Sequence, residues 1–190
     1  MSLNLNILLQ AGFFKEHEGL SEEELLDLLN KKRKEEYSKI FEREYDPGQI
    51  KDDHQLALLD TKKFLDIDLE ADVCDENRVY TSILEDFAKA SNGHFSPTKI
   101  EETWESEEGP IKVSFMSNGY KVSFEPEYND DWLDPELFDT INGEMQKVTT
   151  EIFYQCGGPN EEWLGQNMIY VRLTESEKKL LEDKLDWKFL

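Results

Sequence analysis

The sequence predicts an α+β fold in which a mainly antiparallel sheet is packed by helices. Three observations support this prediction: a hairpin sequence around Asn118-Gly119, an alternating stretch within residues 64–73, and helices that begin with capping sequences. Alternation with period two is typical of a strand with one buried face, and capping sequences mark helix starts. The order of these elements, a run of strands, a helix, two strands and a helix, favours an antiparallel α+β arrangement.

The hairpin is predicted over residues 111–125, from the sequence IKVSFMSNGYKVSF and the residue after it. Asn-Gly between two alternating runs is the strongest short signal for a two-residue turn. Such a turn fixes the register and places the apolar residues on one face, with opposite charges paired on the other. The expected pairs are Ser117 with Tyr120, Phe115 with Val122, Val113 with Phe124, Met116 with Lys121, Ser114 with Ser123, and Lys112 with Glu125.

The other elements follow from the same patterns. The sequence ENRVYTSILEDFAKASNG predicts an amphipathic helix that ends at an Asn-Gly pair. Asp134 is the expected N-cap of a short helix with Pro135 in its first position, and Thr174 with Glu177 forms a capping box for the last helix. We expect Trp187 to pack back onto the body. Besides the hairpin, strands are predicted near residues 64–73, 98–105, 150–156 and 168–173.

An N-terminal helix is predicted between residues 21 and 45. Ser21 and Glu24 form a capping box, and DPG ends the helix. The basic run KKRK interrupts its apolar stripe, so the helix either projects from the body or splits in two. The predicted division is an N-terminal helical arm over residues 1–50 and a single α+β domain over residues 54–190.

Charge is the most pronounced feature of the composition. The 190 residues include 21 Lys and Arg against 43 Asp and Glu, which gives a formal net charge of -22. Such a surface repels nucleic-acid phosphates and anionic lipids, so neither a nucleic acid nor a membrane is an expected partner. It favours fast encounter with a basic protein, although the same charge could serve solubility alone.

The cysteine count and the hydropathy favour the cytoplasm. Cys74 and Cys156 are too few for a disulfide framework or a zinc site, and we expect two free thiols in a reducing compartment. No run of about 18 apolar residues predicts a membrane span. The N-terminus lacks the pattern of a secretory signal. No cofactor is expected, because no phosphate-binding glycine motif is present.

The stretch FLDIDLEADVC, residues 64–74, places a carboxylate at every second position. Same-face neighbours on a strand lie about 6.6 Å apart, and each pair repels by about 0.6 kcal/mol in water. A domain tolerates this cost, so the primary interpretation is the solvated face of a strand. A surface for a basic partner and a site for a divalent cation are the alternatives. The carboxylates are those of Asp66, Asp68, Glu70 and Asp72.

A second acidic segment, EPEYNDDWLDPE, spans residues 125–136. It lacks the glycine and the spacing of a calcium-binding EF-hand loop. Its acids are typical of turns and of the first turn of a helix, and we expect Trp132 to be a core anchor. The alternative is a hot spot for a cationic partner, formed by Asp130, Asp131 and Trp132.

One further loop is a candidate site, and the catalytic combinations are weak. The sequence CGGPNEEWLGQ, residues 156–166, is expected to form a long connection that carries Trp163. Nothing in the spacing of the three histidines and two cysteines supports nucleophilic catalysis. With 43 acidic residues, carboxylate pairs carry no information about acid-base catalysis.

Two functions of different classes follow. The first is a non-enzymatic acidic binding module for a basic protein, similar in general character to bacterial immunity proteins, although no motif identifies such a family. The residues expected to contact the partner are Asp66, Asp68, Glu70, Asp72, Asp130, Asp131, Trp132 and Trp163. The alternative is a metal-assisted hydrolase whose ligands are Asp66, Asp68 and carboxylates of residues 125–136. A third hypothesis is an accessory domain that docks through the N-terminal helix.

Overall fold

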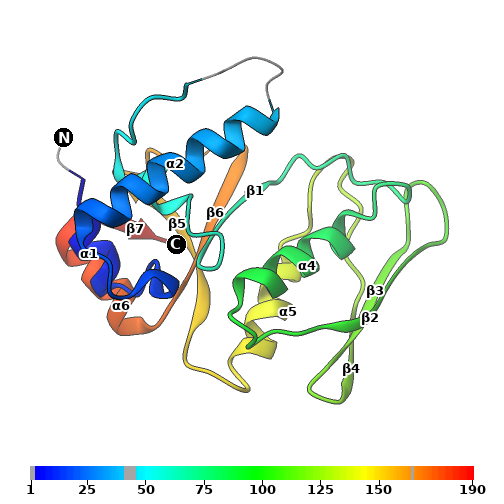
Figure 1. Ribbon diagram of the computed structural model, residues 1–190. Coiled ribbons are helices and arrows are strands. Elements are labelled where there is room, and N and C mark those ends of the chain that lie inside the picture. The colour runs from blue at the N-terminus through cyan, green and yellow to red at the C-terminus, as the bar shows by residue number, and fades with distance from the viewer. Residues whose placement is uncertain (1–2, 41–45, 164) are drawn as a thin grey trace.

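The computed structural model describes residues 3–40, 46–163 and 165–190, and it confirms the α+β fold (Figure 1). The described residues form two antiparallel sheets. The four-stranded sheet has the order β1-β6-β5-β7, and the three-stranded sheet has the order β2-β3-β4. The strands are β1 Phe64–Asp68, β2 Thr98–Trp104, β3 Ile111–Ser117, β4 Tyr120–Phe124, β5 Ile152–Pro159, β6 Asn167–Leu173 and β7 Trp187–Phe189.

The helices form two groups, one beside each sheet (Figure 1). Helices α1, α2 and α6 lie around the four-stranded sheet, whereas α4 and α5 lie toward the three-stranded sheet. Among the described residues, no helix is long and apolar enough to cross a membrane. The helices are α1 Leu5–Gln10, α2 Glu22–Ile40, α3 Asp53–Ala57, α4 Val79–Ala90, α5 Glu136–Met145 and α6 Glu175–Leu185, with a short 3-10 helix at Lys15–His17.

Two hydrophobic cores lie on either side of the four-stranded sheet. Along β6, Ile169 and Val171 pack in the core with the N-terminal helices, and Tyr170 between them packs in the core with α4 and α5. A strand buried on both faces has a continuous apolar sequence, as MIYVRL does. The α4 face predicted to be buried is buried: Val79, Ile83, Leu84, Phe87 and Ala90.

The hairpin register is as predicted. β3 and β4 pair from Ser117 with Tyr120 through Val113 with Phe124, with no shift between them. Asn118 and Gly119 have φ of 50 and 85. This left-handed backbone suits asparagine and glycine and explains why the two-residue turn could be located from the sequence.

The N-terminal helix begins as predicted, and its first turns are part of a core. The Ser21 N–H donates to Glu24 Oε2 at 2.8 Å, and the Glu24 N–H donates to the Ser21 hydroxyl at 3.3 Å. Leu25 and Leu29 are each 1% exposed, so this part of the helix packs inward, whereas Ile40 is 73% exposed. The last predicted residues, 41–45, lie outside the described residues. The division into an arm and a domain stays a prediction.

Three elements differ from their predictions, two in their end points and one in its type. β1 ends at Asp68 instead of continuing to residue 73, because the Asp68 carboxylate accepts the Glu70 N–H at 3.1 Å and turns the chain. β5 continues to Pro159, through the glycines expected in a loop. The tail at Trp187 packs back as expected, and it does so as a strand, β7, on the edge of β5.

Candidate functional site

The two acidic segments of the sequence meet in the structure. Glu70 and Trp132 form an isolated antiparallel bridge although they are far apart in the chain. Residues paired in this way share a face, so their side chains lie close to each other. Backbone hydrogen bonds flank the bridge: from the Ala71 N–H to the Asp131 carbonyl at 2.9 Å, and from the Leu133 N–H to the Leu69 carbonyl at 3.1 Å.

We call the exposed residues at this junction the acidic patch: Glu70, Asp72, Asp130, Asp131 and Trp132. Trp132 is 46% exposed, so the expectation that it anchors the core is wrong. Its neighbour Leu133 takes that place, at 6% exposed. The bridge to Glu70 sets which of the two side chains points inward, and a bridge between distant segments cannot be read from local hydropathy.

Asp134 holds the segment that carries the patch. Its carboxylate accepts the Glu127 N–H at 2.6 Å and the Glu136 N–H at 2.8 Å. Its own N–H donates to the Tyr80 hydroxyl at 3.3 Å, which links the segment to α4. The predicted capping role is thus retained in a modified form, because α5 begins at Glu136 and the carboxylate of Asp134 satisfies its first N–H.

The field at the patch is negative and uncompensated. In the part of the chain that the structure describes, the four carboxylates of the patch form no ion pair. The pKa of the nearby Tyr128 phenol is raised, first by desolvation and then by the carboxylates of Asp130, Glu108 and Asp131. A phenol responds in this way because its anion is repelled by fixed negative charge.

The meeting of the two segments does not assemble a metal site within the described residues. Nowhere in them do three or more histidine, cysteine, aspartate or glutamate side chains gather closely enough to hold a metal ion. A hard cation takes six or more oxygen ligands, several of them carboxylates in a dedicated protein site. The metal-assisted alternative needs the carboxylates of the two segments to gather around one point. In the described residues the backbones of the two segments meet, but their carboxylates do not form such a cluster.

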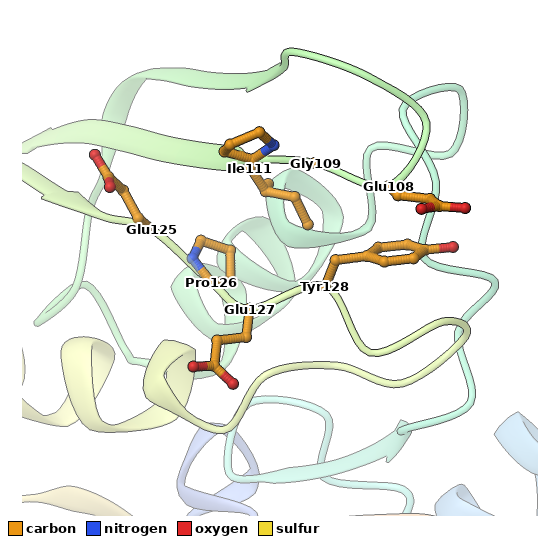
Figure 2. A pocket seen from close by; sticks show the side chains of 8 residues that line it. Glu108, Gly109, Ile111, Glu125, Pro126, Glu127 and Tyr128 are labelled. Carbon is orange, nitrogen blue, oxygen red and sulfur yellow. The ribbon is translucent and has the colours of Figure 1, made fainter.

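A hollow of about 530 Å³ opens beside the patch, between the turn before β3 and the segment after β4. In Figure 2, Ile111 and Pro126 point into it, Glu108 and the Tyr128 ring lie close together at one end, and Glu125 lies at the other. Tyr128 connects the hollow to the patch, since its ring lines the hollow and its phenol feels the charges of Glu108 and of the aspartates at 130 and 131.

Asp66 and Asp68 are exposed, as the alternation predicts, and they lie on β1, which comes directly before the patch residue Glu70 in the chain. The Asn167 amide donates to Asp66 Oδ1 at 2.8 Å, and the Gln166 amide donates to Asp68 Oδ1 at 3.2 Å. Both aspartates line a hollow of about 200 Å³ between β1 and α4. The predicted row of carboxylates is thus exposed to solvent along its length. Its first two members lie on β1, and its last two follow the end of that strand.

Trp163 lies in the other core. Its ring centroid is 4.7 Å from those of His54 and Trp187 and 6.1 Å from that of Phe64. It covers Gly158, where an added Cβ would come within 2.2 Å of the indole. The indole is half-buried in this aromatic group, and its neighbours Phe64 and Trp187 belong to the core of the N-terminal helices.

Sequence reasoning missed a buried network of charges. Arg172 is 4% exposed; its Nε donates to the Ala90 carbonyl at 2.9 Å, and its guanidinium pairs with Glu151. Lys63 is 1% exposed, and its Nζ lies 3.2 Å from Glu177 Oε2. The only sequence signal was an arginine inside the apolar run of β6. The network links both groups of helices to the four-stranded sheet.

Comparison of the chain with protein-family models, curated proteins and solved structures finds no match.

Proposed function

We propose that the protein is a non-enzymatic binding module that engages a basic protein partner through the acidic patch. One observation carries the proposal: Trp132 is 46% exposed and is bridged to Glu70 in a row of exposed carboxylates. Tryptophan is highly buried on average, and it is the residue type most enriched in binding hot spots.

The charges of the patch define the partner. Its four carboxylates form no ion pair within the described residues, so their charge is available to a binding protein. The whole chain, with a formal net charge of -22, adds a long-range attraction for a basic surface. Fields of this kind raise association rates and discriminate against acidic partners.

The patch is also held in place before binding. The bridge to Glu70 fixes the backbone at Trp132. The Asp134 carboxylate fixes the same segment by accepting the N–H groups of Glu127 and Glu136. An interface that is already ordered loses less conformational entropy on association. This order supports a specific contact over a diffuse electrostatic one.

Asp66 and Asp68 extend the negative face along β1, where the amides of Gln166 and Asn167 orient them. Trp163 takes no part in the proposed surface, because its ring packs on Gly158 in the opposite core. We place the protein in the bacterial cytoplasm, in an inhibitor-like or immunity-like role.

Photo-crosslinking in cells that make the protein tests the proposal. A photoreactive amino acid replaces Trp132 in one variant and Tyr120 in a control. Tyr120 is 76% exposed and lies at the hairpin turn, away from the bridge. We expect a protein of basic isoelectric point to crosslink from position 132 and not from position 120. An acidic or neutral partner at position 132, or equal products from both positions, would contradict the proposal.

A further inference from the structure

The hollow beside the acidic patch has an apolar floor. Ile111 is 1% exposed, and Gly109 and Pro126 are buried. Its volume of about 530 Å³ lies within the roughly 300–1,000 Å³ of sites that enclose small ligands. The hollow can therefore hold one long side chain together with the residues that flank it in a partner.

The rim of the hollow carries three glutamates from two segments of the chain. Glu125 lies 3.6 Å from the Lys112 ammonium, an exposed pair that water screens. Glu108 and Glu127 have no cationic partner within residues 3–40, 46–163 and 165–190. A cationic group in the hollow would offset this charge, whereas an acidic or purely apolar group would leave it uncompensated.

The wall of the hollow is aromatic. The ring of Tyr128 forms one end, and Trp104 supports it edge-on with a centroid separation of 6.1 Å. Figure 2 places the Glu108 carboxylate beside this ring. A planar guanidinium can stack on an aromatic face and donate two parallel hydrogen bonds to a carboxylate. An ammonium is a compact, strongly hydrated charge that lacks this fork.

We infer that this hollow receives an arginine side chain of the basic partner, with the guanidinium on Tyr128 and its N–H groups on Glu108. The inference rests on the proposed function and names the residue that anchors the partner. The acidic patch then contacts the basic surface around that arginine. Trp132 and Tyr128 lie on the same short segment, so one partner can occupy both positions.

The test is an NMR titration with acetyl-Gly-Arg-Gly-amide, followed at the Ile111 methyl groups and the Tyr128 ring. The matched peptides carry citrulline, which has the shape of arginine without its charge, or lysine. We expect saturable shifts with the arginine peptide and weaker ones with the other two. Glu108→Gln and Tyr128→Leu should each raise the apparent Kd about threefold to tenfold. The control Glu18→Gln, at an exposed carboxylate of the N-terminal segment, should not change it.

Three results would overturn the inference: no shift at Ile111, equal shifts with citrulline or lysine, or an unchanged Kd in Glu108→Gln. The Glu108 side chain is exposed and forms no hydrogen bond or ion pair within the described residues, so this variant keeps the test valid if Tyr128→Leu fails to fold. A basic protein crosslinked at Trp132 without a response at Ile111 would refute the arginine anchor and leave the proposed function standing. A response at Ile111 without such a crosslink would support the anchor and count against the acidic patch.

Discussion

Replacing Lys63 with methionine tests the electrostatics of the buried network. Burial of the ammonium is the largest influence on this group and lowers its pKa from 10.5 to about 8. Glu177 on α6 opposes this change, whereas Arg172 on β6 and Lys15 on the N-terminal segment reinforce it. The Phe13 ring lies 5.6 Å from the Nζ atom and completes the surroundings.

The lowered pKa has a defined consequence for stability. Between pH 8 and pH 10.5 the unfolded chain retains a proton on Lys63 that the folded chain has released. The free energy of unfolding therefore rises with pH across this window, and the rise between pH 8 and pH 10 is about 2 kcal/mol. Well below pH 8 both states hold the proton, and Lys63 adds no slope.

Urea titrations at pH 7, 8, 9 and 10 on wild type and Lys63→Met measure this effect. The other titrating groups are present in both proteins, so the difference between the two unfolding free energies isolates Lys63. We expect wild type to gain about 2 kcal/mol on the variant between pH 8 and pH 10. A difference that stays constant with pH would refute the reasoning, because a protonated amine would then carry no burial penalty in this fold.

Three further predictions concern single positions. Gly158→Ala places a Cβ within 2.2 Å of the Trp163 indole at a φ of 70, and should lower the unfolding free energy by about 2 to 4 kcal/mol in urea. A loss below about 1 kcal/mol would contradict that packing. Asn118→Ala, at a φ of 50, should cost about 1 kcal/mol in the same assay, and unchanged stability would argue against the turn. Burial raises the pKa of Cys156 to about 12, so a disulfide reagent at pH 8 should label Cys74 alone until urea is added. Equal labelling rates in the folded protein would exclude that burial.

Local patterns predicted much of the fold because local interactions determine those elements. The hairpin register depends on Asn118-Gly119 and on alternation within a few residues. The final capping box depends on Thr174 and Glu177, whose mutual hydrogen bonds are present at 3.2 and 2.9 Å. The alternation around Asp66 predicted which side chains face water, independently of what lies next to them.

The candidate site could be predicted only in part, because long-range contacts build it. Both acidic segments and Trp132 were identified from the sequence, but their bridge was not, and the burial of Trp132 was predicted wrongly. The network at Lys63 shows the same limit, since its ion pair with Glu177 spans 114 positions of the chain. The sequence shows which residues are acidic but not which of them are paired. Glu177 pairs with a buried lysine and the acids of the patch are exposed, and this difference arises from tertiary packing.

The central claim is that the acidic patch, and not the overall charge, recruits a basic protein. The direct measurement is the association rate with the partner crosslinked at Trp132, at low and at physiological salt. One variant neutralises the four carboxylates of the patch by Glu70→Gln, Asp72→Asn, Asp130→Asn and Asp131→Asn. A matched control loses four exposed carboxylates elsewhere, by Glu18→Gln, Glu23→Gln, Asp27→Asn and Asp183→Asn.

Both variants have the same net charge, so only the position of the lost charges differs. We predict an association rate about tenfold lower for the patch variant than for the control at low salt, with a smaller difference at physiological salt. Equal rates for the two variants would contradict the account, because the partner would then respond to the total charge and not to the acidic patch.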